Sequence, residues 1–193
     1  MEKEKEMKYF EIVDSPELKY APQLKNWYGK FDVRNIRIDR FPELPENQLF
    51  FIEPSDHTVY TDIIRFPFLL VSPMVKAVIR MYRECCFFRN IVLLDSVRKE
   101  SRQYFLPVLD ETNEIEVEQI NYKNGIHVSE KAHRDQEILA LDRHLFWVRD
   151  YQKRHTILSM DMAESLIRRG ITGLGLCEVR LYQKCGERIY EKI

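Results

Sequence analysis

One stretch of the chain, residues 66–95, constrains the fold more than any other. It begins with a continuous apolar run, Phe68 to Val71, which has the length and composition of a buried strand. Ser72 then follows as a candidate helix cap, and Pro73 stands at the first helical position, where its missing N–H costs nothing. The spacing of the next apolar residues predicts a short amphipathic helix over about residues 73–84, after which β-prone residues return.

The same order of signals recurs in residues 155–182. Ser159 is the candidate cap, acidic residues follow it closely, basic residues come at the far end, and Gly170 ends the pattern. A second amphipathic helix is therefore predicted over about residues 160–169, again between two strands. The two units share little sequence beyond their cap serines, so common local physics explains the likeness as well as a duplication does.

The first third of the chain has a weaker pattern of short extended segments separated by prolines. Extended structure is predicted for Asn35–Asp39, Gln48–Glu53 and Thr58–Tyr60. Their connections are too short to contain crossover helices, which favours an antiparallel meander. Farther on, Leu145–Val148 and His155–Leu158 flank a polar run and predict a hairpin.

These patterns together predict an α+β protein, built mainly of antiparallel sheet with two short helices, each flanked by strands. A chain of 193 residues is expected to form a single domain over residues 1–193. Within it, residues 8–65 could form a β-rich subregion, beside strand–helix–strand units at 66–95 and 155–182.

Charge and hydropathy narrow the classes of partner. Thirty Lys and Arg face thirty-one Asp and Glu, so no global field draws the chain to nucleic acid or to an anionic membrane. The longest apolar run, Phe66 to Val71, contains Pro67 and is far too short to cross a bilayer. The charged N-terminal residues do not match a signal peptide, and a cytoplasmic location is therefore expected.

The spacing of glycine, histidine and cysteine matches no known catalytic or metal motif. The close glycines, at positions 170, 173 and 175, follow a predicted helix instead of opening one, as a phosphate loop would. The five histidines include no pair at i and i+4, and Cys177 and Cys185 are too far apart for a zinc knuckle. Adjacent Cys85 and Cys86 are interpreted as packed thiols. No catalytic residue, metal ion or cofactor is therefore predicted.

Two weaker patterns leave alternatives open. Asp142 and His144 could belong to a hydrolytic triad with an unidentified nucleophile, although Asp-x-His is common by chance. Basic and aromatic residues also alternate between positions 143 and 154, as on a surface that binds single-stranded nucleic acid. A solvated hairpin with aromatic residues in the core is the preferred interpretation of that segment.

The most distinctive surface feature is an acidic segment, residues 110–122. Within it Glu114, Glu116 and Glu118 alternate with apolar residues, so a half-buried strand would place all three carboxylates on one face. Such a face either protects an edge strand from unwanted pairing or attracts a basic partner. The three glutamates are the predicted partner-binding residues.

Four segments carry a family resemblance: FPFLLVSPMVKAVI at 66–79, YFLPVL at 104–109, LFWVRD at 145–150 and TILSMDMAESLIRRGITGLGL at 156–176. In these pieces, spread over roughly residues 9–182, the chain resembles a bacterial family of unknown function whose members are grouped with immunity proteins of polymorphic toxin systems. The resemblance implies a non-enzymatic cytoplasmic protein that binds and blocks a cognate toxin. It implies no catalytic or binding residue by position.

The expected function is therefore toxin neutralisation by direct binding, with the acidic strand meeting a basic toxin such as a nuclease. Two alternatives remain: an uncharacterised hydrolase using Asp142 and His144, and a scaffold domain that binds a protein unrelated to toxins. Neither nucleic acid nor membrane is an expected partner.

Overall fold

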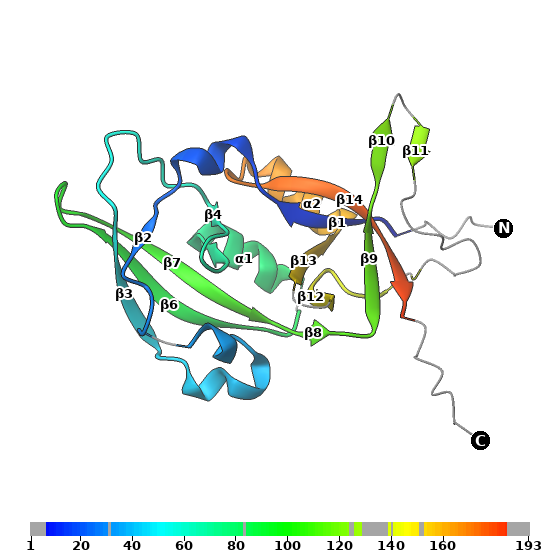
Figure 1. The fold of residues 1–193 in the computed structure, drawn as a ribbon, viewed down its shortest axis with the longest axis horizontal. Helices are drawn as coiled ribbons and strands as arrows, with labels where there is room; N and C mark the ends of the chain where they lie inside the picture. The colour runs from blue at the N-terminus through cyan, green and yellow to red at the C-terminus, as the bar shows by residue number, and fades with distance from the viewer. Residues whose placement is uncertain are drawn as a thin grey trace, which may run out of the picture.

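The computed structural model describes residues 7–30, 32–82, 84–123, 126–128, 139, 141–150 and 153–184. Within these ranges the chain forms two six-stranded sheets, one separate two-stranded hairpin and two α-helices (Figure 1). Each large sheet contains one parallel pair of strands and is otherwise antiparallel. The predicted α+β class with mainly antiparallel strands is confirmed.

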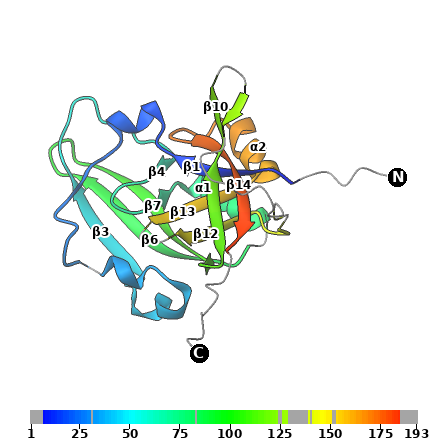
Figure 2. The ribbon, with the colours of Figure 1, turned by 45° about the vertical axis from the view of Figure 1, so that its right-hand side comes forward.

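The first sheet, which we name sheet A, joins strands from both ends of the chain. In sheet order its strands are β8 (Glu111–Thr112), β12 (Leu145–Asp150), β13 (Lys153–Ser159), β1 (Tyr9–Val13), β14 (Gly175–Gln183) and β9 (Ile115–Gln119). Only two residues separate β8 at one edge from β9 at the other. Sheet A is therefore curled on itself, and Figure 2 shows β14 crossing in front of β12 and β13.

The second sheet, sheet B, is built around a long hairpin. Its order is β2 (Leu24–Lys25), β3 (Asn47–Ile52), β6 (Cys86–Asp95), β7 (Glu100–Leu109), β5 (Leu70–Val71) and β4 (Ile63–Ile64). The remaining hairpin, β10 (Asn121–Lys123) and β11 (Ile126–Val128), projects from the body in both views.

The two helices form where their cap residues predict. Helix α1 (Pro73–Met81) starts after Ser72, whose hydroxyl accepts the N–H of Val75, and ends three residues earlier than expected. Helix α2 (Met160–Arg168) starts after Ser159 and ends one residue earlier than expected. Gly170 then adopts a left-handed φ of 66°, as the stop signal required.

Both strand–helix–strand units have the same topology. The unit around α1 connects β5 to β6 in sheet B, with β7 lying between them and antiparallel to both. The unit around α2 connects β13 to β14 in sheet A, where β1 occupies the same intermediate position. Each helix therefore links two parallel strands that are one strand apart.

The predictions for the first third of the chain are corrected in three respects. The antiparallel meander is wrong, because β3 pairs in parallel with β6. Residues 35–39 are not extended: they lie in and between two 3-10 helices, η2 (Val33–Asn35) and η3 (Ile38–Glu43), after η1 (Pro16–Tyr20). Thr58–Tyr60 lies outside the strands of the described chain. The range 8–65 is also divided between the sheets, since β1 belongs to sheet A and β2 to β4 to sheet B.

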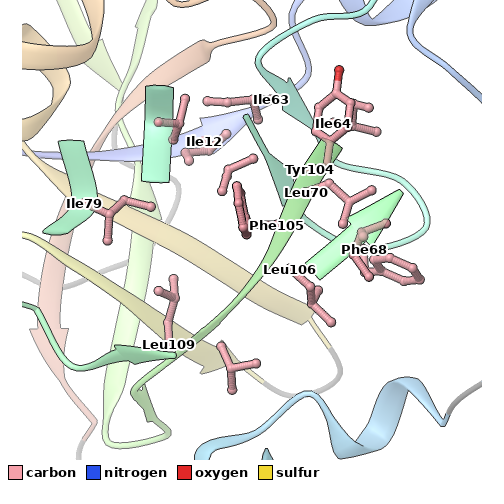
Figure 3. Packing of buried hydrophobic residues seen from close by; sticks show 14 of the residues in the cluster. Ile12, Ile63, Ile64, Phe68, Leu70, Ile79, Tyr104, Phe105, Leu106 and Leu109 are labelled. Carbon is pink, nitrogen blue, oxygen red and sulfur yellow. The ribbon is translucent and has the colours of Figure 1, made fainter. Parts of the chain in front are cut away.

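A single large core joins the two sheets and both helices. Figure 3 shows side chains from β1 (Ile12), β4 (Ile63), α1 (Ile79) and β7 (Leu106) pointing into one interior. A second, smaller core lies on the other face of sheet A, inside its curl, and includes Phe146. Burial of this apolar surface is the main stabilising contribution to the fold.

The connection after α2 fastens sheet A to sheet B. The N–H of Ile63 in β4 donates to the carbonyl of Thr172 (3.2 Å), and the Asp62 carboxylate accepts both the N–H and the hydroxyl of Thr172. Gly173 is required there, because its φ is 75° and a Cβ would lie 2.5 Å from the carbonyl oxygen of Ile63.

Candidate functional site

The three glutamates predicted to bind a partner do not form one exposed row. Glu114 is exposed just before β9, and Glu116 is half-buried within it. Glu118 is only 6 % exposed, accepts a hydrogen bond from the Tyr182 hydroxyl (3.1 Å) and lies opposite Arg180 of β14. The expectation of an exposed acidic face is therefore corrected for Glu118, whose buried carboxylate contacts β14 within sheet A. Glu114 and Glu116 remain predicted partner-binding residues.

His144 lies close to a serine, as the hydrolase alternative requires, but that serine is buried. Nδ1 of His144 is 2.8 Å from Oγ of Ser159, and Glu84 accepts the backbone N–H of His144. Ser159 is 1 % exposed, and its Oγ also accepts the N–H of Met162 as the cap of α2. Asp142 is exposed. A substrate has no route to Ser159, so the contact holds the start of α2 against β12.

The predicted hairpin of basic and aromatic residues exists, as β12 and β13. Its side chains divide between two faces: Trp147, Arg149 and Arg154 lie on one, and Phe146 and Lys153 on the other. Both aromatic rings are buried, as the preferred interpretation required. Tyr151 lies outside the described residues. The face of Trp147 opens on the region between the sheets.

Three hollows follow one another along that region. The first, of about 420 Å³, lies between η1 and the segment after β4. The central one, of about 450 Å³, lies between η2, residues 65–69 and the β12–β13 hairpin. The third, of about 570 Å³, lies between η3 and the turn after β7. Arg65 lines the first and second, and Arg149 lines the second and third, so we treat the three as one groove.

A cluster of charged side chains lies at the junction of the second and third hollows. Arg149 and Arg154 are direct cross-strand partners, an arrangement that is repulsive by itself. The Glu111 carboxylate accepts from Nε of both, at 2.6 and 2.5 Å. Burial alone raises the pKa of Glu111, but the two guanidinium groups outweigh this effect and hold its pKa below the usual value.

Trp147 fixes the second arginine in place. The guanidinium carbon of Arg154 lies 4.2 Å from the centroid of the indole ring, at cation–π distance. Burial lowers the pKa of Arg154, and the nearby charge of Glu111 opposes that shift. Arginine remains protonated throughout the accessible pH range, so the cluster carries two positive charges and one negative charge.

Two further arginines line the central hollow from the opposite side. Arg34 forms an ion pair with Asp32, which also caps η2, and Arg65 forms one with Asp14 at the end of β1. Both carboxylates are more than a third exposed. Pairs of this kind are weak and readily rearranged, because water competes for both charges.

Aromatic rings border the groove beside Arg65. Trp27 stacks on Tyr28, with ring centroids 3.7 Å apart, and meets Phe66 and Phe68 edge-on. Phe66 lines the first hollow and Phe68 the central one. Tyr28 is 77 % exposed and Phe66 73 % exposed. Large aromatic side chains so exposed are a recurrent feature of interaction surfaces.

Sequence reasoning missed this groove as a site, because its residues come from segments more than 100 positions apart. One signal was present in the predicted hairpin. Antiparallel pairing about the polar run places Arg149 opposite Arg154, and the alternation of side chains places Trp147 on the same face. The contribution of Glu111 depends on the parallel pairing of β8 with β12, which no local pattern specifies.

Within the described ranges, His, Cys, Asp and Glu side chains form no group of three that could hold a metal ion. No helix among the residues placed by the structure has the length and apolar character needed to cross a membrane. The cysteines differ from expectation at Cys85, which is exposed, while burial raises the pKa of Cys86 to about 12.

Comparison with known proteins gives no further guide. No protein-family model matches this chain, and no curated protein or solved structure matches it.

Proposed function

We propose that this protein acts without catalysis, by binding another protein in the groove between its two sheets, and that the partner is a cognate bacterial toxin which it blocks. The observation that carries the binding role is the composition of the groove, where four arginines line the central hollow and the exposed ring of Phe66 lines the adjoining first hollow. Tyrosine, tryptophan and arginine supply most of the binding energy at protein interfaces. The family resemblance in the sequence supports the toxin as partner.

The groove has the build of a preformed binding surface. Arg149 and Arg154 are held by the Glu111 carboxylate, and Arg154 also by the indole ring of Trp147. A side chain held in this way loses little conformational freedom when a partner binds. Glu114 and Glu116 would add a minor contact of opposite sign at the edge of sheet A.

The test begins by expressing the genes that adjoin this one and screening for a product that stops bacterial growth. Co-expression of the present protein should restore growth, and the two purified proteins should form a complex. Arg65→Gln combined with Phe66→Ala should weaken that complex by about tenfold or more, because both side chains line the groove. Phe51→Ala is the matched control, since Phe51 is exposed on β3 and lines none of the three hollows.

Other results would separate the alternatives. Binding without restored growth would favour a scaffold role. Loss of neutralisation in Ser159→Ala or His144→Ala, with the complex intact, would favour a hydrolase. Failure of the two proteins to bind would overturn the proposal.

A further inference from the structure

The central hollow carries an uncompensated positive charge. Among the described residues that line it are Arg34, Arg65, Arg149 and Arg154, and none of those lining residues is acidic. The carboxylates that pair with these arginines, Asp14, Asp32 and Glu111, approach from outside the hollow. Four positive charges against three negative ones leave an excess of one.

The protein maintains this excess against repulsion. Arg149 and Arg154 lie directly opposite each other on β12 and β13, and the single carboxylate of Glu111 bridges them. The Glu111 carboxylate accepts its hydrogen bond from Nε of Arg154. A cross-strand arginine pair is destabilising unless an anion lies between the two side chains. Because the two guanidinium groups share a single carboxylate, the cluster keeps a net positive charge, and this charge favours the approach of a second anion.

Apart from Thr156, the remaining residues that line the hollow are largely apolar. Pro67, Phe68, Leu69 and Leu106 line it together with the indole of Trp147. An apolar pocket with a few convergent charged groups suits a ligand that combines a carboxylate with an apolar neighbour. Arginine is well adapted to a carboxylate, because its planar fork offers two parallel N–H donors.

We propose that the central hollow binds an acidic segment of the partner protein, whose Asp or Glu carboxylate is received by Arg154 and Arg149 while an adjacent apolar side chain packs near Trp147. This inference rests on the proposed function and adds the chemistry of the partner. It reverses the expectation of a purely basic partner surface, because the charge in the groove is positive.

A nucleic acid is the less favoured occupant. The whole chain has a formal net charge of −1, which gives no long-range attraction for a polyanion. Each arginine of the hollow already has a carboxylate partner, and the single excess charge matches one added carboxylate better than a row of phosphates. The side chains of Pro67, Phe68, Leu69 and Leu106 in its walls offer a phosphate backbone no hydrogen bonds.

Two matched peptides test the proposal on the protein alone. The chain has two tryptophans, so Trp27→Phe leaves Trp147 as the source of the single indole N–H signal in an NMR spectrum. Into this protein one titrates acetyl-Phe-Glu-amide or acetyl-Phe-Gln-amide, which differ only in the carboxylate. The Glu peptide should shift the Trp147 signal saturably, and the Gln peptide should bind about tenfold more weakly or worse.

Three substitutions in the same background locate the effect. Arg154→Gln should weaken the Glu peptide by about tenfold, while Arg168→Gln, which removes an exposed arginine of α2, should leave binding unchanged. Glu111→Gln should tighten binding several-fold, because it removes the competing internal carboxylate. A gain of affinity cannot result from unfolding, so this variant remains informative even if Arg154→Gln is unstable.

The contrary results are equally definite. Equal shifts by both peptides, no shift by either, or binding that Glu111→Gln leaves unchanged or weakens would overturn the proposal. A short oligothymidylate that shifts the Trp147 signal at lower concentration than the Glu peptide would replace it with a nucleic-acid site. Because no toxin is present, this test can fail while toxin binding stands, and toxin binding can fail while the peptide result stands.

Discussion

Sheet A contains two carboxylates, Glu11 and Glu111, that each accept hydrogen bonds from basic side chains, but the two clusters they form differ in function. Glu11 is 1 % exposed, and its donors are His155 (2.8 Å), Gln119 (2.7 Å) and Lys153 (3.3 Å). These three side chains surround one carboxylate inside the curl of the sheet. Glu111 lies on the opposite face, in contact with two guanidinium groups at the groove.

The difference between the two clusters lies in which group is in excess and where it faces. At Glu11 the anion is enclosed by donors, so the cluster is complete within the chain. At Glu111 two cations share one anion, and both line an open hollow. We infer that the first cluster serves stability and the second serves binding.

The largest effect is expected on stability at Glu11. Glu11→Gln should lower the free energy of unfolding by about 2–3 kcal/mol, because charge-assisted hydrogen bonds to a buried group are lost. Urea denaturation measures this change. The control is Glu164→Gln, which breaks an exposed helical pair with Arg168 and should cost less than about 0.5 kcal/mol. Equal losses for both variants would contradict the structural role of Glu11.

The same residue predicts a pH dependence. Burial by itself raises the pKa of Glu11, but hydrogen bonds from His155 and Gln119 outweigh burial and lower the pKa from 4.5 to about 2. A lowered pKa means that the stabilisation is complete above about pH 4.5 and is lost as the pH falls from there toward about 2.

The measurement compares urea midpoints of the native protein and of Glu11→Gln, near neutral pH and at about pH 3. The native protein should lose stability more steeply on acidification than the variant does. Parallel losses in the two proteins would show that other carboxyl groups cause the acid sensitivity.

At Arg154 we expect a large effect on partner binding and a small effect on stability. Arg154→Gln should reduce affinity for the partner by about tenfold or more, and should change the free energy of unfolding by about 1 kcal/mol or less. The reason is that Arg149 still pairs with Glu111 after the substitution. Calorimetric titration and urea denaturation of one preparation give both numbers. A variant with lower stability and unchanged affinity would place Arg154 with the structural cluster instead.

The smallest effect is expected at the edge of sheet A. Reversing Glu114 and Glu116 to lysine should slow association with the partner by roughly two- to fivefold at low salt, as exposed charges at an interface rim do. Stopped-flow kinetics at two salt concentrations measure this change. An unchanged rate would remove β9 from the contact surface and leave the groove alone.

The sequence predicts those parts of this fold that depend on short-range signals. Ser72 and Ser159 cap their helices through hydrogen bonds three residues away, and the β12–β13 hairpin closes across a short polar run. Each of these signals is complete within about ten residues, so no distant part of the chain can override it easily.

The errors occur where a distant or a competing contact decides the structure. The parallel pairing of β3 with β6 joins segments about forty positions apart, and nothing in Gln48–Glu53 specifies that partner. Around Asn35 the extended pattern loses to a local competitor, because the Asp32 carboxylate accepts the N–H of Arg34 and starts a 3-10 turn. The alternation of residues in β9 predicts the correct face of the strand for Glu118. The burial of Glu118, however, depends on the pairing of β9 with β14.

The groove, and neither the interior of sheet A nor its acidic edge, is expected to contact the partner. Amide hydrogen exchange of this protein with and without the toxin tests that claim most directly. Exchange should slow in residues 32–39 and 65–69, which supply lining residues of the central and third hollows, with little change in β1 around Glu11. Slower exchange confined to residues 114–119, or unchanged exchange in both groove segments of a formed complex, would contradict it.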